Sequence, residues 1–218
     1  MSLERDQEEN IINAGNHTVF IETEFECADG STQTKTGTGF FVSENLILTA
    51  KHNVVSDDGL KSRIAIKYEG VKFVKPTDPT ISCELVAHMQ PTDPAKYHPL
   101  EDLAILKCPA HHSPCFLRLS TETCLTEDMV VHVIGYPGKV EEGWLTSRHE
   151  TLKGDPKSNV KIVQDMLPRR KLTVSEGKIM GGPVEPGCAK YEVSTVPGMS
   201  GGCLLYEDKV CGIVPAIF

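Results

Sequence analysis

The chain has 218 residues and a mass of 23.9 kDa, enough to bury a sizeable core as one domain or as two small, tightly joined ones. Its formal net charge of −8 argues against a nucleic-acid partner, because nucleic-acid-binding surfaces are normally basic. No stretch is long and apolar enough to span a bilayer, so we expect no membrane partner. The charged first ten residues lack the apolar core of a secretory signal, which favours a cytoplasmic protein unless a signal has been removed.

Apolar residues alternate with polar ones at a period of two along most of the chain. The one fair helix candidate is residues 3–14, inside an N-terminal extension over residues 1–16. Short strand-like runs separated by turn residues follow at 19–25, 64–68, 71–73, 85–87, 103–105, 131–133, 172–174 and 210–213. Many short strands at such intervals predict an all-β fold, either a sandwich or a pair of barrels.

Proline, serine, threonine and charged residues accumulate over residues 111–127, which we take as a linker between two halves, residues 17–110 and 128–218. The connection over residues 141–170 is longer than the strands need. Variable surface is its plainer interpretation and a functional loop is the alternative. The one compact basic run, Arg169 to Lys171, is expected to be a solvated loop.

Ser200 lies between glycines in the segment VPGMSGG, residues 196–202. Acyl transfer by a serine needs a tightly turned backbone whose N–H groups point at the carbonyl oxygen under attack, and glycine tolerates that geometry. The pattern also occurs in ordinary turns. Two other segments support the chemical interpretation, since His52 ends the segment TAKH and Asp102 precedes the apolar run LAIL. Histidine, aspartate and serine in this order can form a nucleophilic triad.

Together these motifs resemble the chymotrypsin-fold, trypsin-like serine proteases. The matching stretches are TGFFV at 38–42, LTAKH at 48–52, DLAI at 102–105 and GMSGG at 198–202. The stretches VIGYPG at 133–138 and YEVST at 191–195 look most like the glutamyl endopeptidases, with the high-temperature-requirement proteases as near relatives. The resemblance covers roughly residues 17 to 218. It implies two six-stranded antiparallel β-barrels with the active site in the cleft between them.

The resemblance implies a serine endopeptidase that acts on protein or peptide substrates and needs no cofactor. His52 would accept the proton of Ser200, Asp102 would orient the imidazole, and the backbone N–H groups of Gly198 and Ser200 would form the oxyanion hole. Met199 replaces the aspartate that pairs with a new N-terminus in secreted trypsins, so activation by that switch is excluded. Family members usually continue further, so we expect either further domains in a longer parent chain or a naturally shortened protein. The alternative function is a non-catalytic binding or regulatory module.

The implied specificity pocket differs from those of the relatives. Ser194 stands at the position of trypsin's pocket-base aspartate, so a preference for Arg or Lys is not expected. Thr195 keeps a threonine that helps glutamyl endopeptidases bind a carboxylate, whereas Val214, followed by Pro215, replaces their histidine. Ile217 falls where a glycine usually opens the pocket. We therefore expect cleavage after small uncharged residues.

The eight cysteines favour free thiols, because they are scattered and lack CxxC spacing. Extracellular trypsins usually link the strand before the histidine to the residue after it. The matching positions here are Gly37 and Asn53, so that disulfide cannot form. The segment CPAHHSPC, residues 108–115, offers four soft ligands that could close on zinc. Its prolines and its place after the Asp102 strand favour a linker loop, and we expect no metal.

Overall fold

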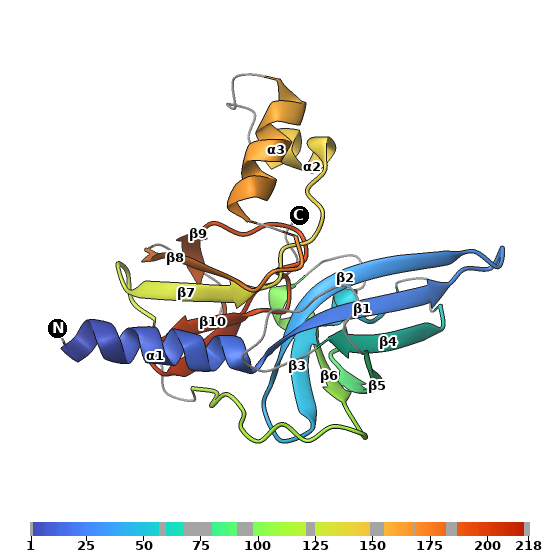
Figure 1. The fold of residues 1–218 in the computed structure, drawn as a ribbon, viewed down its shortest axis with the longest axis horizontal. Helices are drawn as coiled ribbons and strands as arrows, with labels where there is room; N and C mark the ends of the chain where they lie inside the picture. The colour runs from blue at the N-terminus through green and yellow to red at the C-terminus, as the bar shows by residue number, and fades with distance from the viewer. Residues whose placement is uncertain are drawn as a thin grey trace.

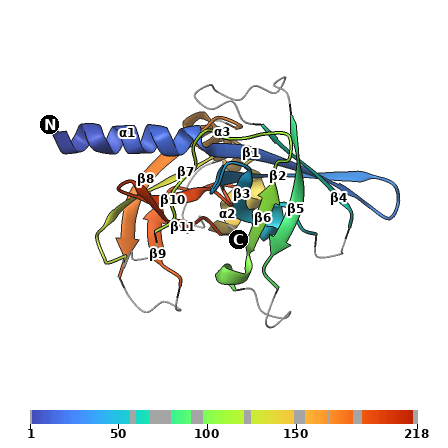
Figure 2. The same ribbon diagram turned by 90° about the horizontal axis from the view of Figure 1, so that it is seen from below.

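The computed structural model describes residues 2–56, 60–67, 80–90, 98–120, 125–148, 155–167, 169–181 and 187–215. Two β-structures lie side by side in both views of the ribbon (Figures 1 and 2). The first is a closed antiparallel barrel with the strand order β1-β2-β3-β6-β5-β4. Its strands are β1 (Thr18–Glu26), β2 (Thr32–Phe41), β3 (Leu46–Ala50), β4 (Ser62–Lys67), β5 (Ile81–His88) and β6 (Leu103–Lys107). The all-β expectation and the first six-stranded barrel are confirmed. The expected strand at residues 71–73 lies outside the described residues.

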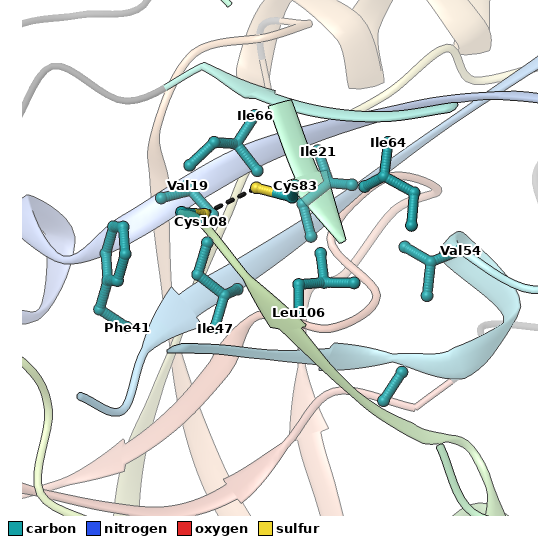
Figure 3. Close-up of a cluster of buried hydrophobic side chains, with 11 residues drawn as sticks. Val19, Ile21, Phe41, Ile47, Val54, Ile64, Ile66, Cys83, Leu106 and Cys108 are labelled. Atoms are coloured by element: carbon teal, nitrogen blue, oxygen red, sulfur yellow. Dashed lines mark hydrogen bonds between the residues drawn. The ribbon is translucent and has the colours of Figure 1, made fainter. Parts of the chain in front are cut away.

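The barrel interior is apolar because one face of each strand points into it. On β1, Val19 and Ile21 face inward and are fully buried, together with Ile47 of β3 and Leu106 of β6 (Figure 3). Phe20, which points the other way, is equally buried because its ring meets Tyr136 edge-on, with centroids 5.9 Å apart. The polar face expected for β1 is therefore covered at this point by the second half of the chain.

The second β-structure is an open sheet of five strands within the described residues, in the order β11-β10-β7-β8-β9. Its strands are β7 (Val130–Gly135), β8 (Thr173–Met180), β9 (Lys190–Val193), β10 (Cys203–Tyr206) and β11 (Lys209–Ile213). The expected second six-stranded barrel is corrected accordingly. The linker covers the β11 edge: Ser120 N–H donates to the Val210 carbonyl at 2.8 Å, and Val210 N–H to the Arg118 carbonyl at 3.0 Å. A covered edge offers no free ladder on which a closing strand could pair.

In the part of the chain that the structure describes, three α-helices accompany the sheets. The first, α1 (Ser2–Asn16), runs beside β7 and β10 and buries Ala14 (Figures 1 and 2). Two more helices, α2 (Glu142–Arg148) and α3 (Pro156–Met166), follow β7 and precede β8 in the chain. They lie above the second sheet in Figure 1. No described helix is long and apolar enough to cross a membrane.

The sequence analysis missed α2 and α3, and α3 has clear causes in its sequence. Asp155 caps its first turn by accepting the Ser158 N–H at 3.0 Å, and a proline occupies the first helical position. Val160, Val163 and Leu167 follow helical spacing and pack against the core of the second sheet. A capped amphipathic helix therefore replaces the irregular loop expected over residues 141–170.

Candidate active site

His52 and Asp102 meet at the same end of the barrel because their strands are paired. His52 lies on a one-turn 3-10 helix, η1 (Lys51–Asn53), directly after β3, and Asp102 follows a second, η2 (Pro99–Glu101), directly before β6. The register pairs the last residue of β3 with the first of β6, so the two turns lie together. Asp102 Oδ2 lies 2.7 Å from His52 Nδ1, and Oδ1 accepts the His52 backbone N–H at 2.9 Å.

This contact determines what the histidine can do. A carboxylate only accepts hydrogen bonds, so the Nδ1 atom facing it must carry the proton, and Nε2 then keeps a free lone pair. The Asp102 side chain is 4% exposed, whereas that of His52 is 37% exposed. The buried carboxylate holds the ring through one nitrogen while the other remains able to accept a proton.

Ser200 follows a turn formed by residues 196–199. Pro197 and Gly198 take its central places, Met199 N–H donates to the Val196 carbonyl at 3.1 Å, and Gly198 has a φ of 90°. This is the pattern of a type II turn, which needs glycine at its third place. A Cβ on Gly198 would also collide with the backbone of residue 138. Glycine is therefore required by both conformation and space.

The turn leaves two of its backbone N–H groups pointing away from the residues that hydrogen-bond to its carbonyls. Gly138 N–H donates to the Pro197 carbonyl at 2.5 Å, and Gly202 N–H donates to the Met199 carbonyl at 3.0 Å. No cis peptide bond occurs among the described residues, so the N–H of the next residue points opposite each carbonyl. Those N–H groups belong to Gly198 and Ser200, and neither donates a hydrogen bond within the described chain. Two unused donors of this kind can stabilise an oxyanion.

Two residues to which the sequence analysis gave no role in the site connect the two halves. Thr38 Oγ1 donates to the Gly198 carbonyl at 2.8 Å, and Thr38 N–H donates to the Ser200 carbonyl at 3.0 Å. Asn53 Nδ2 donates to the same Ser200 carbonyl at 2.9 Å and contacts Thr49 Oγ1 at 3.2 Å. Asn53 is buried directly beside His52 in sequence, and a side chain at Gly37 would occupy its space. The sequence drew attention to Gly37 and Asn53 only because they stand where extracellular trypsins have a disulfide.

The structure brings Ser200 to the His52 turn through the backbone. Gly201 packs against Thr49 and Ala50, where β3 ends and η1 begins. Within the described residues, no hydrogen bond joins the Ser200 hydroxyl to the His52 ring. Hydrogen bonds of this kind are often long without substrate and tighten in the complex, so the arrangement remains compatible with proton transfer.

The expected pocket residues do not form one uniform wall. Ser194 is exposed, and Thr195 and Pro215 are half-buried. Val214 is fully buried among Val196 and Met199, and its backbone supports the serine segment by accepting the Gly201 N–H at 2.8 Å. Ile217 lies outside the described residues. Met199 is fully buried, so an apolar side chain packs where secreted trypsins have the aspartate that directly precedes the serine.

The zinc alternative is not supported by the geometry around residues 108–115. Cys108 is buried in the barrel with its sulfur 2.7 Å from that of Cys83, whereas Cys115 is exposed (Figure 3). His111 packs against Phe41 with ring centroids 5.6 Å apart. Its pKa is lowered mainly by burial and, to a smaller extent, by the neighbouring His112. Over the described residues, no three His, Cys, Asp or Glu side chains lie close enough to hold a metal ion.

Comparisons with known proteins identify the family of the chain and support its fold. The family model of the trypsin-like peptidase domain matches residues 37–213. The crystal structure of Deg5 is similar with a TM-score of 0.61 at 18% identity, over 99% of this chain and 86% of that one. The Rv3671c protease from M. tuberculosis, in its active form, is similar with a TM-score of 0.57 at 20% identity, over 94% of this chain and 71% of that one. These identities support the fold alone. Comparison with curated proteins gave no match.

Proposed function

The chain belongs to the trypsin-like peptidase domain family and is a serine protease, and on this premise we propose that it hydrolyses peptide bonds through His52, Asp102 and Ser200. One observation carries the proposal. The Asp102 carboxylate lies 2.7 Å from His52 Nδ1, and the residue after His52 is hydrogen-bonded to the Ser200 carbonyl. A general base and a candidate nucleophile are thus attached to each other across the two halves.

The proposed mechanism uses each atom for one task. Ser200 Oγ attacks the substrate carbonyl while His52 Nε2 accepts the hydroxyl proton, and Asp102 stabilises the resulting imidazolium. The N–H groups of Gly198 and Ser200 bind the developing oxyanion. His52 then returns the proton to the leaving amine, which departs and leaves an acyl group on Ser200. Water, deprotonated by the same ring, hydrolyses that ester.

The proposed specificity is for a small, uncharged residue before the scissile bond. Ser194 offers no charge for a substrate Arg or Lys, and Thr195 can supply one hydroxyl to a small polar side chain. The position after Ile213 holds an apolar, fully buried Val214 and so offers no cation to a substrate glutamate. A carboxylate buried without such a partner is costly.

A double-mutant cycle tests the proposed unit. His52→Ala and Ser200→Ala should each lower kcat on a peptide substrate by several orders of magnitude, and the double variant should be hardly worse than either alone. His112→Ala is the control, because that ring is exposed in the linker and 68% of its side chain is accessible. Additive losses, or normal turnover by Ser200→Ala, would contradict the assignment.

A further inference from the structure

A hollow of about 450 Å³ opens beside the oxyanion turn. Pro197 and Gly198 form one of its sides, and Thr34 and Thr36 of β2 form another. Strand residues two apart share a face, so these threonines continue the line of Thr38, which holds the Gly198 carbonyl. The hollow therefore borders the proposed oxyanion hole at Gly198.

Its position identifies which part of a substrate could enter it. None of the expected pocket residues that the structure describes, at positions 194, 195, 214 and 215, lines the hollow. A substrate carbonyl bound at the Gly198 N–H with its acyl side chain toward residues 194–195 has its leaving group on the other side of Gly198. Extended chain advances about 3.3 Å per residue, so the first two residues after the scissile bond reach the hollow.

The charged residues that line the hollow are Lys139, Glu141, Arg169 and Arg170, so its lining is basic on balance although the whole chain carries a net charge of −8. Lys139 pairs with Glu141 at 3.0 Å, and Arg170 pairs with Glu22 at 3.0 Å. Arg169 also lines the hollow, is exposed, and makes no ion pair with the described residues. One positive charge thus remains uncompensated.

The basic run is a solvated loop only in part, because Arg169 and Lys171 are exposed whereas Arg170 is half-buried. Arg170 adopts a left-handed backbone conformation with φ of 60°, rare for a residue with a side chain, and its N–H donates to the Pro137 carbonyl at 2.8 Å. Its guanidinium lies over the Phe20 ring at 5.4 Å, and its buried Nε makes no hydrogen bond in the described chain. The backbone bond and the ring contact fix the run against the body of the protein, beside the turn that precedes Ser200.

We propose that this basic hollow binds an acidic side chain of the substrate at the first or second position after the scissile bond. The inference rests on the proposed protease function and adds to it a preference on the leaving-group side. Arg169 supplies the uncompensated charge, and Arg170, which is paired with Glu22, lines the hollow beside it.

Matched peptides test the preference. They share the same residues before the scissile bond and carry Glu, Gln or Lys at the first or second position after it. For the wild type, kcat/KM for the better Glu peptide should exceed that for its Gln partner about two- to fivefold, and the Lys peptide should be the poorest. The Glu preference should shrink at high salt, because exposed charges are screened.

Charge variants locate the effect. Arg169→Ala should bring the Glu to Gln ratio close to one, and Arg169→Glu should invert the order of Glu and Lys. Lys171→Ala is the matched control, since it removes the same charge from the same exposed run but does not line the hollow, and its ratio should equal that of the wild type.

A binding measurement separates this inference from the proposed function. Fluorescence anisotropy with the same peptides on Ser200→Ala needs no turnover, and the Glu peptide should bind more tightly than the Lys peptide. If the protein cleaves the Glu, Gln and Lys peptides equally and Arg169→Glu does not change this, the proposed binding of an acidic side chain is overturned while the proposed protease function stands. If no peptide is cleaved but the Glu peptide binds more tightly than the Lys peptide, and Arg169→Glu inverts that order, the proposed protease function is overturned and the binding of an acidic side chain is supported. If all peptides bind equally, the proposed binding of an acidic side chain is overturned, whether or not the protein cleaves them.

Discussion

The two halves of the molecule position their parts of the site by different means. In the closed barrel, strand register places His52 and Asp102 together, and both sit on short turns whose backbone is hydrogen-bonded to the partner turn. In the open sheet, Ser200 depends on a glycine turn and on donors from the other half, Thr38 and Asn53. The base is therefore held within one half, whereas the nucleophile is held at the junction.

The halves also differ in what surrounds the site. The expected pocket residues, the two helices between β7 and β8 and the basic run all belong to the second half. An open sheet with long connections can change these parts without disturbing barrel closure. Under the proposed mechanism, substrate choice should therefore respond to changes in the second half, and the base should respond to changes in the first.

The largest effect should come from within the barrel. Asp102→Asn keeps the size of the side chain but can present an N–H to His52 Nδ1, which favours the wrong tautomer. We expect kcat to fall about ten-thousand-fold with little change in KM. Steady-state kinetics on one peptide substrate measures this change. A loss of less than tenfold would show that the histidine does not depend on the buried carboxylate.

The second effect should come from the junction. Asn53→Ala removes the donor to the Ser200 carbonyl without touching substrate, so Asn53 is a positioning residue. Losing one buried hydrogen-bond partner typically costs about 1–3 kcal/mol, and we expect kcat to fall at least about fivefold at nearly unchanged KM. Asn53→Asp, which keeps the volume but cannot donate, should lose as much.

A merely structural role for Asn53 would give a different result. In that case, the melting temperature would fall and kcat of the folded fraction would stay at the wild-type value in both variants. Circular dichroism beside active-site titration distinguishes the two outcomes.

The third effect concerns the second half alone. Glu before the scissile bond should be cleaved about tenfold less efficiently than Ala, because no cation replaces the missing histidine. Gln at the same place isolates the contribution of charge. A peptide-library profile measures all three residues together. Dominance of Glu would mean that another residue supplies the charge, and dominance of Arg or Lys would refute the assigned pocket.

The smallest effect should be that of a reductant. The described cysteines are free thiols, and burial raises the pKa of Cys203 to about 12 and that of Cys211 to about 11. Below those values they stay protonated, so at pH 7 both should resist alkylation while exposed Cys115 reacts. Adding reductant should hardly move the melting temperature. A loss of about 2–5 kcal/mol in stability would reveal a disulfide, and Cys83 with Cys108 would then be the first pair to replace.

The proposed site could be predicted from the sequence because its chemistry needs fixed residue types at fixed places. Gly198 must adopt a positive φ, Ser200 lies between glycines, and His52 ends the short segment TAKH. Alternation also predicted most strands, including β1, where buried residues alternate with exposed or half-buried ones from Ile21 onward.

The remaining features depend on contacts that no local pattern contains. Asn53 reaches a carbonyl far along the chain, and Phe20 is buried only because Tyr136 covers it. Leu119 of the linker pairs with Val210 of β11, which strand spacing cannot indicate. In contrast, Asp155 and the apolar spacing that follows could have predicted α3, but the long connection was interpreted as irregular.

Covalent labelling tests the central claim most directly, because it asks whether Ser200 is an activated nucleophile without requiring the right substrate. A fluorophosphonate probe should label the folded protein once, and peptide mapping should place the adduct on Ser200. Labelling should disappear in Ser200→Ala and fall sharply in His52→Ala, while His112→Ala should label like the wild type. Folded wild-type protein that takes up no probe, or takes it up equally in Ser200→Ala, would contradict the account and favour a non-catalytic module with the protease fold.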